Sequence, residues 1–290
     1  MARSWSSSRW TSLGAVAACC ALAAAGCAKK QAAPPQVQSA PHHVIVTAQD
    51  YSFTAPDSVE AGLEMFHLVN TGPSLHHLQV VALDSGKTAA DLMAAMKNPG
   101  PPPAFVRFVG GPNAVVPGGA DTSIAYLTLA AGNYALMCLI PDSAGIPHFA
   151  HGMVRALTVT PSDETPAAAP TADVTIHLKD YAFDVTGNLT AGAHTVRIVN
   201  DGPQTHEMLI AQMAPRKKAA DLVSWVETAK MHGMPPAKPL GGATALAPGA
   251  SEVVTVNLAA GDYALLCFLP DAKDGKDHVL HGMVKDLKVG

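Results

Sequence analysis

Two stretches, one near the end of each half of the chain, decide the fold class. Residues 132–154 read GNYALMCLIPDSAGIPHFAHGMV, and residues 261–284 read GDYALLCFLPDAKDGKDHVLHGMV. Each opens with a strand-like run that ends on a cysteine, Cys138 or Cys267. A loop with a proline follows, and then a His-x-x-x-x-Met segment and a short apolar run. The likeness of the two stretches indicates an internal repeat.

The repeat extends through most of the chain at an offset of about 130 residues. Matching segments occur in the same order in both halves: Asp50–Phe53 with Asp180–Phe183, Asn70–Pro73 with Asn200–Pro203, His76 with His206, and Ala89–Leu92 with Ala219–Leu222. Residues 161–173 hold three prolines and three consecutive alanines, a linker composition. We therefore predict two domains, 42–160 and 172–290, joined by a linker at 161–171.

Most segments of each repeat alternate apolar and polar residues with a period of two. Residues 43–48, 195–200 and 253–258 are examples, and turn residues separate such runs at regular intervals. This pattern favours antiparallel β-sandwiches over helical folds. Helical patterns interrupt it only at 89–97 and 219–230, with Asp91 and Asp221 early, where a helix favours an anion. The predicted fold is all-β: two tandem Greek-key β-sandwiches, each with one short helical insertion.

Each repeat offers the same four metal-binding residue types in the same order. The sets are His76, Cys138, His148 and Met153 in the first repeat, and His206, Cys267, His278 and Met283 in the second. Two imidazoles and a thiolate with a weak axial thioether form the ligand set of blue (type-1) copper. Zinc is less suited to this set, because a thioether binds it poorly. We predict one copper ion per domain, cycling between Cu(I) and Cu(II).

At these residues the chain resembles the cupredoxins, over roughly four-fifths of its length. The markers are Asn70-x-Gly72-x-x-x-His76 and its counterpart ending at His206, each followed by the Cys-loop-His-x-x-x-x-Met segment. The His-to-Met spacing is similar to that of plastocyanin. The sequence departs from small cupredoxins between Cys and His, where nine residues intervene in the first repeat and ten in the second. Residues 147–153 resemble the similarly long ligand loop of copper nitrite reductases.

Two choices among histidines stay open at this level. His77 adjoins His76, but Glu207 stands at the matching position of the second repeat, which favours His76 and His206. His151 and His281 also recur and are alternatives to His148 and His278, which we prefer on their spacing to the methionine. A disulfide between Cys138 and Cys267 is the alternative to a separate role for each, and their matching positions favour separate roles.

The N-terminal segment has the features of an export signal. Arg3 and Arg9 precede an uncharged apolar run, which ends at Ala24-Ala25-Gly26-Cys27. This end resembles a bacterial lipobox, which implies a signal peptide at 1–26 and lipidation of Cys27. Residues 27–41, rich in Ala, Pro and Gln, are typical of a flexible tether. We therefore expect a lipid-anchored protein on the periplasmic side of a bacterial membrane.

The remaining features narrow the class of function. A formal net charge of −4 and the lack of a basic cluster argue against a nucleic-acid partner. The sequence contains no Gly-x-Ser-x-Gly or His-Glu-x-x-His motif and no His-x-His pair, so we expect neither an enzyme nor a small-molecule substrate. The leading hypothesis is an electron carrier that serves redox partner proteins. The alternatives are a copper storage or delivery protein without redox turnover, and a metal-free cupredoxin-like assembly module.

Overall fold

The strands follow the period-two segments of the sequence. The computed structural model describes residues 40–97, 100–118 and 122–290. The predicted signal peptide, Cys27 and the tether up to residue 39 lie outside the described residues. Among the described residues, no helix is long and apolar enough to cross a membrane.

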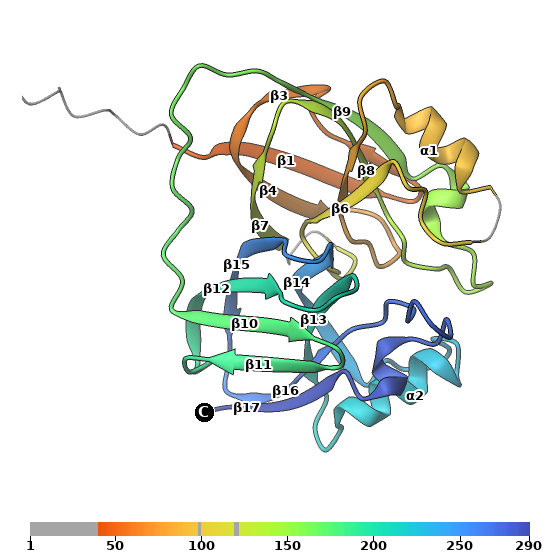
Figure 1. The fold of residues 1–290 in the computed structure, drawn as a ribbon. Helices are drawn as coiled ribbons and strands as arrows, with labels where there is room; N and C mark the ends of the chain where they lie inside the picture. Colours follow the sequence, from red (N-terminus) through yellow and green to blue (C-terminus); the bar gives the residue numbers. More distant parts are fainter. Residues whose placement is uncertain (1–39, 98–99, 119–121) are drawn as a thin grey trace, which may run out of the picture. The chain divides into compact units, whose positions relative to one another are not determined.

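In the first repeat, the described residues form nine strands, one short α-helix and one turn of 3-10 helix. These elements are β1 (His42–Gln49), β2 (Ser52–Thr54), β3 (Ser58–Glu60), β4 (Gly62–Asn70), β5 (Gln79–Leu83), α1 (Ala89–Ala95), β6 (Val106–Gly110), β7 (Thr122–Leu129), β8 (Gly132–Met137), η1 (His148–His151) and β9 (Val154–Thr160) (Figure 1).

The second repeat forms the same elements except for a counterpart of β3. They are β10 (Val174–Lys179), β11 (Ala182–Thr186), β12 (Gly192–Asn200), β13 (His206–Met213), α2 (Ala219–Glu227), β14 (Ala237–Leu246), β15 (Ser251–Leu258), β16 (Gly261–Leu266), η2 (His278–His281) and β17 (Val284–Val289). The all-β prediction with one helical insertion per repeat is therefore confirmed.

Both helices begin at the residue expected and end two or three residues early. The carboxylate of Asp91 accepts the backbone N–H of Thr88 at 2.9 Å, and Asp221 accepts that of Lys218 at the same distance. These contacts satisfy amide groups that precede the first helical hydrogen bond.

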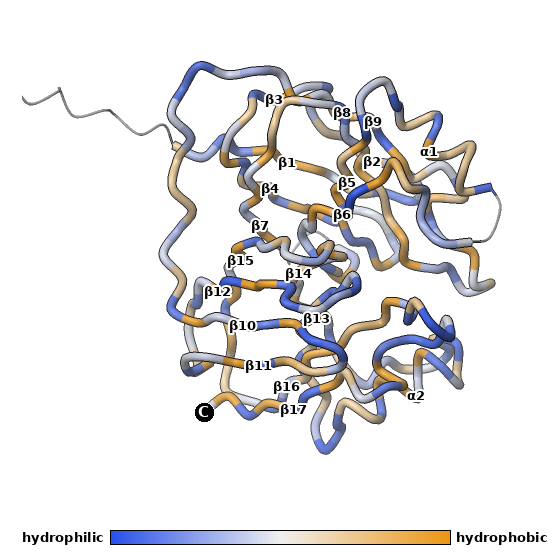
Figure 2. Tube along the Cα trace, in the orientation of Figure 1, coloured by the Kyte–Doolittle hydropathy of each residue, from blue (hydrophilic) through white to orange (hydrophobic). Residues whose placement is uncertain are grey.

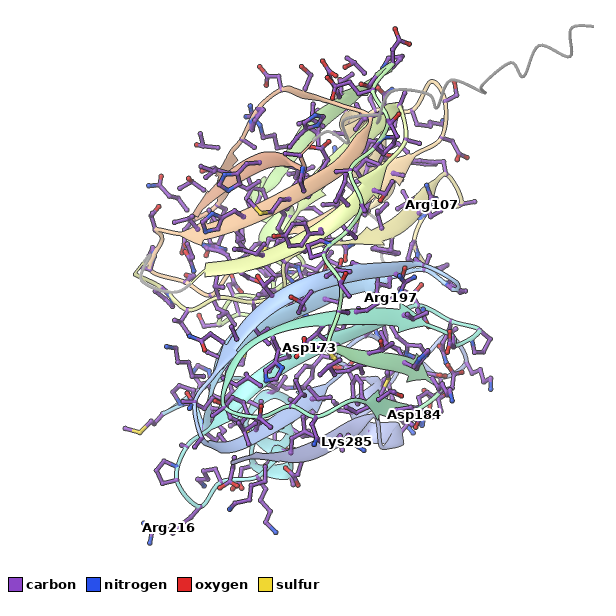
Figure 3. The ribbon with its side chains drawn as sticks, turned by 90° about the vertical axis from the view of Figure 1, so that its left-hand side faces the viewer. Arg107, Asp173, Asp184, Arg197, Arg216 and Lys285 are labelled. Carbon is purple, nitrogen blue, oxygen red and sulfur yellow. The ribbon has the colours of Figure 1, made fainter. Side chains whose placement is uncertain are left out.

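Apolar and polar residues alternate along strands such as β1 and β12, so that one side of each strand faces a core (Figure 2). One large core cluster includes Phe66, Leu68 and Cys138 of the first repeat. A second includes Ile198, Ile210 and Cys267 of the second. Charged side chains such as those of Asp184, Arg197 and Arg216 are exposed (Figure 3). Each cysteine is thus part of a core, where its sulfur is removed from water.

Most strand pairs are antiparallel, as the sequence pattern indicates, but three are not. The pairs β1–β4, β10–β12 and β3–β9 are parallel, whereas the other pairs are antiparallel. A two-residue hairpin can join only antiparallel strands. Between β1 and β4 the chain first passes through β2 and β3, so β4 returns in the same direction as β1.

Both sheets continue from one repeat into the other. The strand orders are β11-β10-β12-β15-β7-β4-β1-β2 and β17-β16-β13-β14-β6-β5-β8-β9-β3. The junctions pair corresponding strands: β7 with β15 and β6 with β14. In the first junction Ala125 lies opposite Val254, its own counterpart in the repeat.

Two glycines at the second junction combine a backbone hydrogen bond to the other repeat with a close approach to their own repeat. The N–H of Asn113 donates to the carbonyl of Gly242 at 3.0 Å, and the N–H of Thr244 donates to that of Gly111 at 2.9 Å. Gly111 and Gly242 have φ of +136° and +110°, which disfavour other residues. A Cβ at Gly111 would lie 2.2 Å from the Leu78 carbonyl oxygen, and the site has no room for it.

Candidate metal centre

Cys138 follows directly on strand β8, and its Sγ lies 4.0 Å from the Nδ1 of the first histidine, His76. Residues 70–76 form the turn that brings His76 there. Asn70 accepts the N–H of Gly72 at 3.0 Å and donates to the carbonyls of Ser74 and Val115, at 2.8 and 3.0 Å. The Asn-x-Gly motif is therefore the local cause of the turn.

The first three predicted ligands converge in the core. The Nδ1 atoms of His76 and His148 are 3.1 Å apart, and the Cys138 Sγ lies 3.5 Å from His148 Nδ1 and 4.0 Å from His76 Nδ1. The point equidistant from these three atoms lies about 2.1 Å from each, close to the lengths of about 2.0–2.3 Å known for metal bonds to His nitrogen and Cys sulfur. The three side chains therefore fit a metal ion without rearrangement.

The second repeat builds the same group. The Nδ1 atoms of His206 and His278 are also 3.1 Å apart, and the Cys267 Sγ lies 3.3 Å from His278 Nδ1. All three side chains are fully buried. Both groups therefore present two imidazole nitrogens and one sulfur, a donor set that suits copper.

The predicted axial residues belong to the same loops. Met153 and Met283 are fully buried. The N–H of Met153 donates to the carbonyl of His148 at 3.1 Å, and its carbonyl accepts the N–H of Cys138 at 3.2 Å. Met283 makes the corresponding bonds to His278 and Cys267, at 2.9 and 3.3 Å.

The long loop between Cys and His, the departure from small cupredoxins, is held by carboxylates. In the first repeat Asp142 accepts the N–H groups of Ala144 and Ile146, at 2.8 and 2.9 Å. In the second, Asp271 accepts the N–H of Lys273 at 2.8 Å and the hydroxyl of Tyr181. The extra residues thus form an ordered turn outside the metal-binding group.

His151 and His281 lie outside the two groups. Their Nε2 atoms pair with Asp142 at 2.9 Å and Asp274 at 3.1 Å, and their rings stack on Tyr51 and Tyr181. His148 and His278, not these two, accompany the cysteines.

One aspartate contacts the first histidine of each group, and neither aspartate was among the predicted site residues. The Nε2 of His76 is 2.6 Å from Asp50 Oδ1, and the Nε2 of His206 is 2.6 Å from Asp180 Oδ1. A carboxylate can only accept, so each Nε2 carries the proton and each Nδ1 keeps its lone pair for a metal. The recurrence of Asp-Tyr in both repeats was the signal that could have revealed them.

Burial controls the protonation of the groups. It lowers the pKa of His148 and His278 to about 4, which leaves both imidazoles neutral near pH 7. It raises the pKa of the Cys138 thiol to about 12 and also raises that of Cys267. A bound cation would replace the thiol proton, because the thiolate is the form that coordinates.

The two cysteines are both free, so the alternative of a disulfide between the repeats is not realised. Each sulfur is fully buried in its own group. This agrees with a separate role for each cysteine.

His77 and Glu207 are the clearest difference between the groups. Each follows the first histidine, and each accepts the backbone N–H of the residue after the cysteine: Leu139 to His77 Nε2 and Phe268 to Glu207 Oε1, both at 2.8 Å. The open choice between His76 and His77 is therefore answered by position, since His77 is occupied by the loop and His76 faces the sulfur.

No family model matches the chain, and no curated protein matches it. Solved structures do align with it. The dithionite-reduced auracyanin of Roseiflexus castenholzii is 21% identical, with 42% of this chain and 100% of that chain covered and a TM-score of 0.30. For auracyanin A, a "blue" copper protein of Chloroflexus aurantiacus, the values are 20%, 42%, 100% and 0.30. The copper nitrite reductase of Nitrosomonas europaea is 15% identical, with 87% of this chain and 94% of that chain covered and a TM-score of 0.26.

The strand order of this chain and the geometry of its His-Cys-His groups support a cupredoxin-like fold. The described residues form two mainly antiparallel sheets, and each repeat holds a buried His-Cys-His group with a buried methionine next to it in the loop. The predicted resemblance is confirmed at this level.

Proposed function

We propose that the chain is a copper-dependent electron carrier with one type-1 site in each repeat. The observation that carries the proposal is the triangle of two Nδ1 atoms and one Sγ, which has the right dimensions for a metal before any metal is added. Soft sulfur suits Cu(I), and imidazole also serves Cu(II). A site held rigidly between these preferences changes little when the metal gains or loses an electron.

The surroundings support a carrier rather than an enzyme. Both groups lie in the core, where two imidazoles and one thiolate of the protein would hold the metal. The only other group of possible ligands among the described residues is Asp271, Asp274 and His281, whose members are already paired in the loop. Redox partner proteins are the expected donors and acceptors of electrons.

Export and membrane attachment are part of the proposal and rest on the sequence. Arg3, Arg9, the apolar run and Cys27 support a lipoprotein-type signal, and residues 27–41 would serve as the tether. Growth with a labelled fatty acid tests this point. Label in the wild-type protein and none in Cys27→Ser is expected, whereas equal label in both would contradict the anchor.

Copper storage or delivery is the second candidate. It uses the same residues but requires exchange of the metal instead of retention. The full burial of both groups favours retention, because exchange requires a partner or solvent to reach the donor atoms.

Titration with Cu(II) tests the proposal. We expect two equivalents to bind, with an intense thiolate-to-copper absorption band, narrow EPR hyperfine splitting and a reversible redox couple. The double variant Cys138→Ser, Cys267→Ser should lose the band. Unchanged copper uptake and spectrum in that variant would refute the assignment, and binding without a reversible couple would favour storage.

A further inference from the structure

A glutamate is buried at the place where the two repeats join. Glu252 of β15 is 2% exposed, and its Oε2 accepts the N–H of Gly111, a residue of the first repeat, at 2.6 Å. Its carboxyl group packs directly on the end of β6, since a Cβ added at Gly110 would lie 2.1 Å from the same oxygen. Glu252 thus belongs to the second repeat but makes its closest contacts with the first.

The carboxyl group of Glu252 lacks the partners that a buried charge needs. Its Oε1 is buried and has no hydrogen-bond partner among the described residues. Apolar residues lie beside it: Ile198 is opposite Glu252 in β12, and Leu246 of β14 packs against Gly110. A charge in such a place is costly, because neither water nor a cation offsets it.

The charged and tyrosine side chains of the surrounding strands do not face Glu252. Arg197 and Tyr126 lie opposite its neighbour Val253, and therefore on the other face of the sheet, whereas Arg107 and Lys238 are exposed.

The next buried carboxyl group is that of Glu64, two strands away on β4, where it pairs with His42 at 2.9 Å. Burial therefore outweighs the Gly111 hydrogen bond and raises the pKa of Glu252 well above its usual value.

The first repeat has a neutral residue at the corresponding place. Ser123 corresponds to Glu252, just as Ala125 corresponds to Val254. Ser123 is also buried, and it packs against Gly241 of the second repeat, where a Cβ would lie 2.5 Å from the serine Oγ. The close packing of the junction therefore does not by itself require a carboxyl group.

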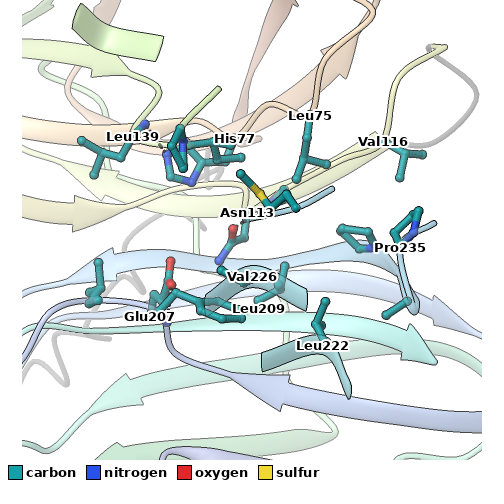
Figure 4. Close-up of a pocket in the computed structure, with 18 of the residues that line it drawn as sticks. Leu75, His77, Asn113, Val116, Leu139, Glu207, Leu209, Leu222, Val226 and Pro235 are labelled. Carbon is teal, nitrogen blue, oxygen red and sulfur yellow. Dashed lines mark hydrogen bonds between the residues drawn. The ribbon is translucent and has the colours of Figure 1, made fainter. Parts of the chain in front are cut away.

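The same junction borders a cavity of about 400 Å³ between the repeats (Figure 4). The Nδ2 of Asn113 donates to the carbonyl of Ala243 at 2.8 Å. The Nε2 of Gln79 donates to the carbonyls of Gly110 and Ala245, at 3.2 and 3.1 Å. Because Gln79, Asn113 and Ala245 also line the cavity, the bonds that close the junction form part of the cavity wall.

We propose that Glu252 is a pH-sensitive switch of the junction between the repeats. With its proton bound, the carboxyl group keeps β6 and β15 in contact. Without the proton, a charge with one unpartnered oxygen remains in an apolar contact, and the junction opens more often, because opening returns the carboxylate to water. The proposal does not depend on copper, since Glu252 and the residues that it contacts are not predicted metal ligands.

The direction of the effect follows from the two states of the junction. In the closed junction Glu252 holds its proton, whereas in water a glutamate loses it near pH 4.5. The contribution of Glu252 to closing is therefore complete below pH 4.5 and is lost as the pH rises toward its raised pKa. Over this range the opening equilibrium should increase about tenfold for each pH unit.

Hydrogen exchange at two amides across the junction measures the opening. The N–H of Asn113 donates to Gly242, and the N–H of Thr244 donates to Gly111. The full chain, kept metal-free with a chelator, is compared by NMR between pH 5 and pH 8 with Glu252→Gln, which keeps an acceptor for Gly111 but cannot ionise. The intrinsic exchange of each amide is the same in both proteins, so the ratio of their rates reports the opening. We expect this ratio, wild type over variant, to increase about tenfold for each pH unit.

Glu64→Gln is the matched control. Glu64 is also buried and also has an oxygen without a partner among the described residues, but it lies within the first repeat. This variant should leave the exchange of Asn113 and Thr244 as in the wild type.

A wild-type to Glu252→Gln ratio that stays constant with pH overturns the proposal. An equal effect of Glu64→Gln also overturns it, because the titration would then not be specific to the junction. If circular dichroism shows that Glu252→Gln is unfolded, Glu252→Ser, which introduces the residue of the first repeat, takes its place. The same increase of the ratio with pH is expected, and a constant ratio again rejects the switch.

Discussion

The two repeats hold the same donor atoms in the same geometry, but they differ in the residue beside the first histidine. In the first repeat His77 accepts the N–H of Leu139, and in the second Glu207 accepts that of Phe268, both at 2.8 Å. An imidazole and a carboxyl group thus accept the same backbone hydrogen bond. The position demands a buried acceptor for the loop, and either an imidazole nitrogen or a carboxyl oxygen meets that demand.

The electrostatic consequences are opposite. Burial lowers the pKa of His77 to about 3, so His77 stays neutral at ordinary pH. Burial raises the pKa of Glu207 to about 7, so Glu207 becomes an anion within the ordinary range. The Glu207 carboxylate also raises the pKa of Cys267, an influence that Cys138 does not receive from His77. A negative charge next to a copper site favours the more positive oxidation state, so we expect the second site to have the lower reduction potential.

Removing one sulfur at a time gives the largest effect and separates the repeats. Cys138→Ser should leave one copper equivalent, with the band and couple of the second site, and Cys267→Ser should leave those of the first. Absorption, EPR and voltammetry of the two variants give the spectrum and the reduction potential of each site separately. Identical potentials in the two variants would show that Glu207 and His77 do not make the two sites electrostatically different.

The pH dependence of stability tests the same pair in metal-free protein. The folded-state pKa of Glu207 is above its unfolded value. Its contribution to the free energy of unfolding is therefore complete below pH 4.5 and is lost as the pH rises through about 7. Glu207→Gln keeps an acceptor for Phe268 and should raise the free energy of unfolding by about 3 kcal/mol at pH 8. At pH 4.5 it should change little.

His77 should behave in the opposite sense. Its folded-state pKa is below the unfolded value, so its contribution is complete above pH 6.5 and is lost as the pH falls toward 3. His77→Gln should therefore gain about 2 kcal/mol relative to the wild type on going from pH 7 to pH 5. Urea unfolding across this range measures both variants. If the free energy of unfolding changed with pH in the same direction for Glu207→Gln and His77→Gln, Glu207 and His77 would not differ in the way proposed.

Replacing the aspartates that contact the first histidines should have a smaller effect, a decrease in copper affinity. Asp50→Ala and Asp180→Ala each free an imidazole Nε2, and the mutated site should bind copper about 10–100-fold more weakly. Asp184→Ala is the control, since this exposed aspartate pairs only with Lys179 on the surface. Competition with a calibrated chelator measures the affinities. Unaltered binding in Asp50→Ala would show that the Asp50–His76 bond does not orient the ring.

The smallest effect is expected from the outer histidines. His151→Ala and His281→Ala remove partly exposed contacts with Asp142 and Asp274, each worth about 0–1 kcal/mol. Copper stoichiometry and the absorption band should stay as in the wild type. Loss of the band in either variant would transfer the ligand role from His148 or His278 to the outer residue.

Local chemistry explains which parts of the site could be predicted. The Asn-x-Gly turn before His76 and the strand that precedes Cys138 depend on neighbours in sequence, so their motifs can be recognised in the sequence. The repeat strengthened the choice of His76 over His77 as the ligand, because His76 and His206 share a motif whereas His77 and Glu207 differ.

Long-range pairing explains what could not be predicted. Asp50 meets His76 across 26 positions of sequence, and only the parallel pairing of β1 with β4 brings the end of β1 to that place. A period-two pattern indicates a strand but does not say which strand lies beside it. The cavity and the continuation of both sheets between the repeats have the same origin, since they depend on the register of β6, β7, β14 and β15.

The junction of corresponding strands has a further consequence. Because β7 pairs with β15, and Ala125 meets its own counterpart Val254, the contact is self-complementary, as in a homodimer with two-fold symmetry. One repeat alone would carry both halves of this contact and would expose the edges of β6 and β7, so residues 40–160 should dimerise in solution. Covalent linkage through residues 161–173 gives each half a fixed partner of its own. It thereby frees the halves to diverge, and at position 77 and its counterpart 207 they have done so.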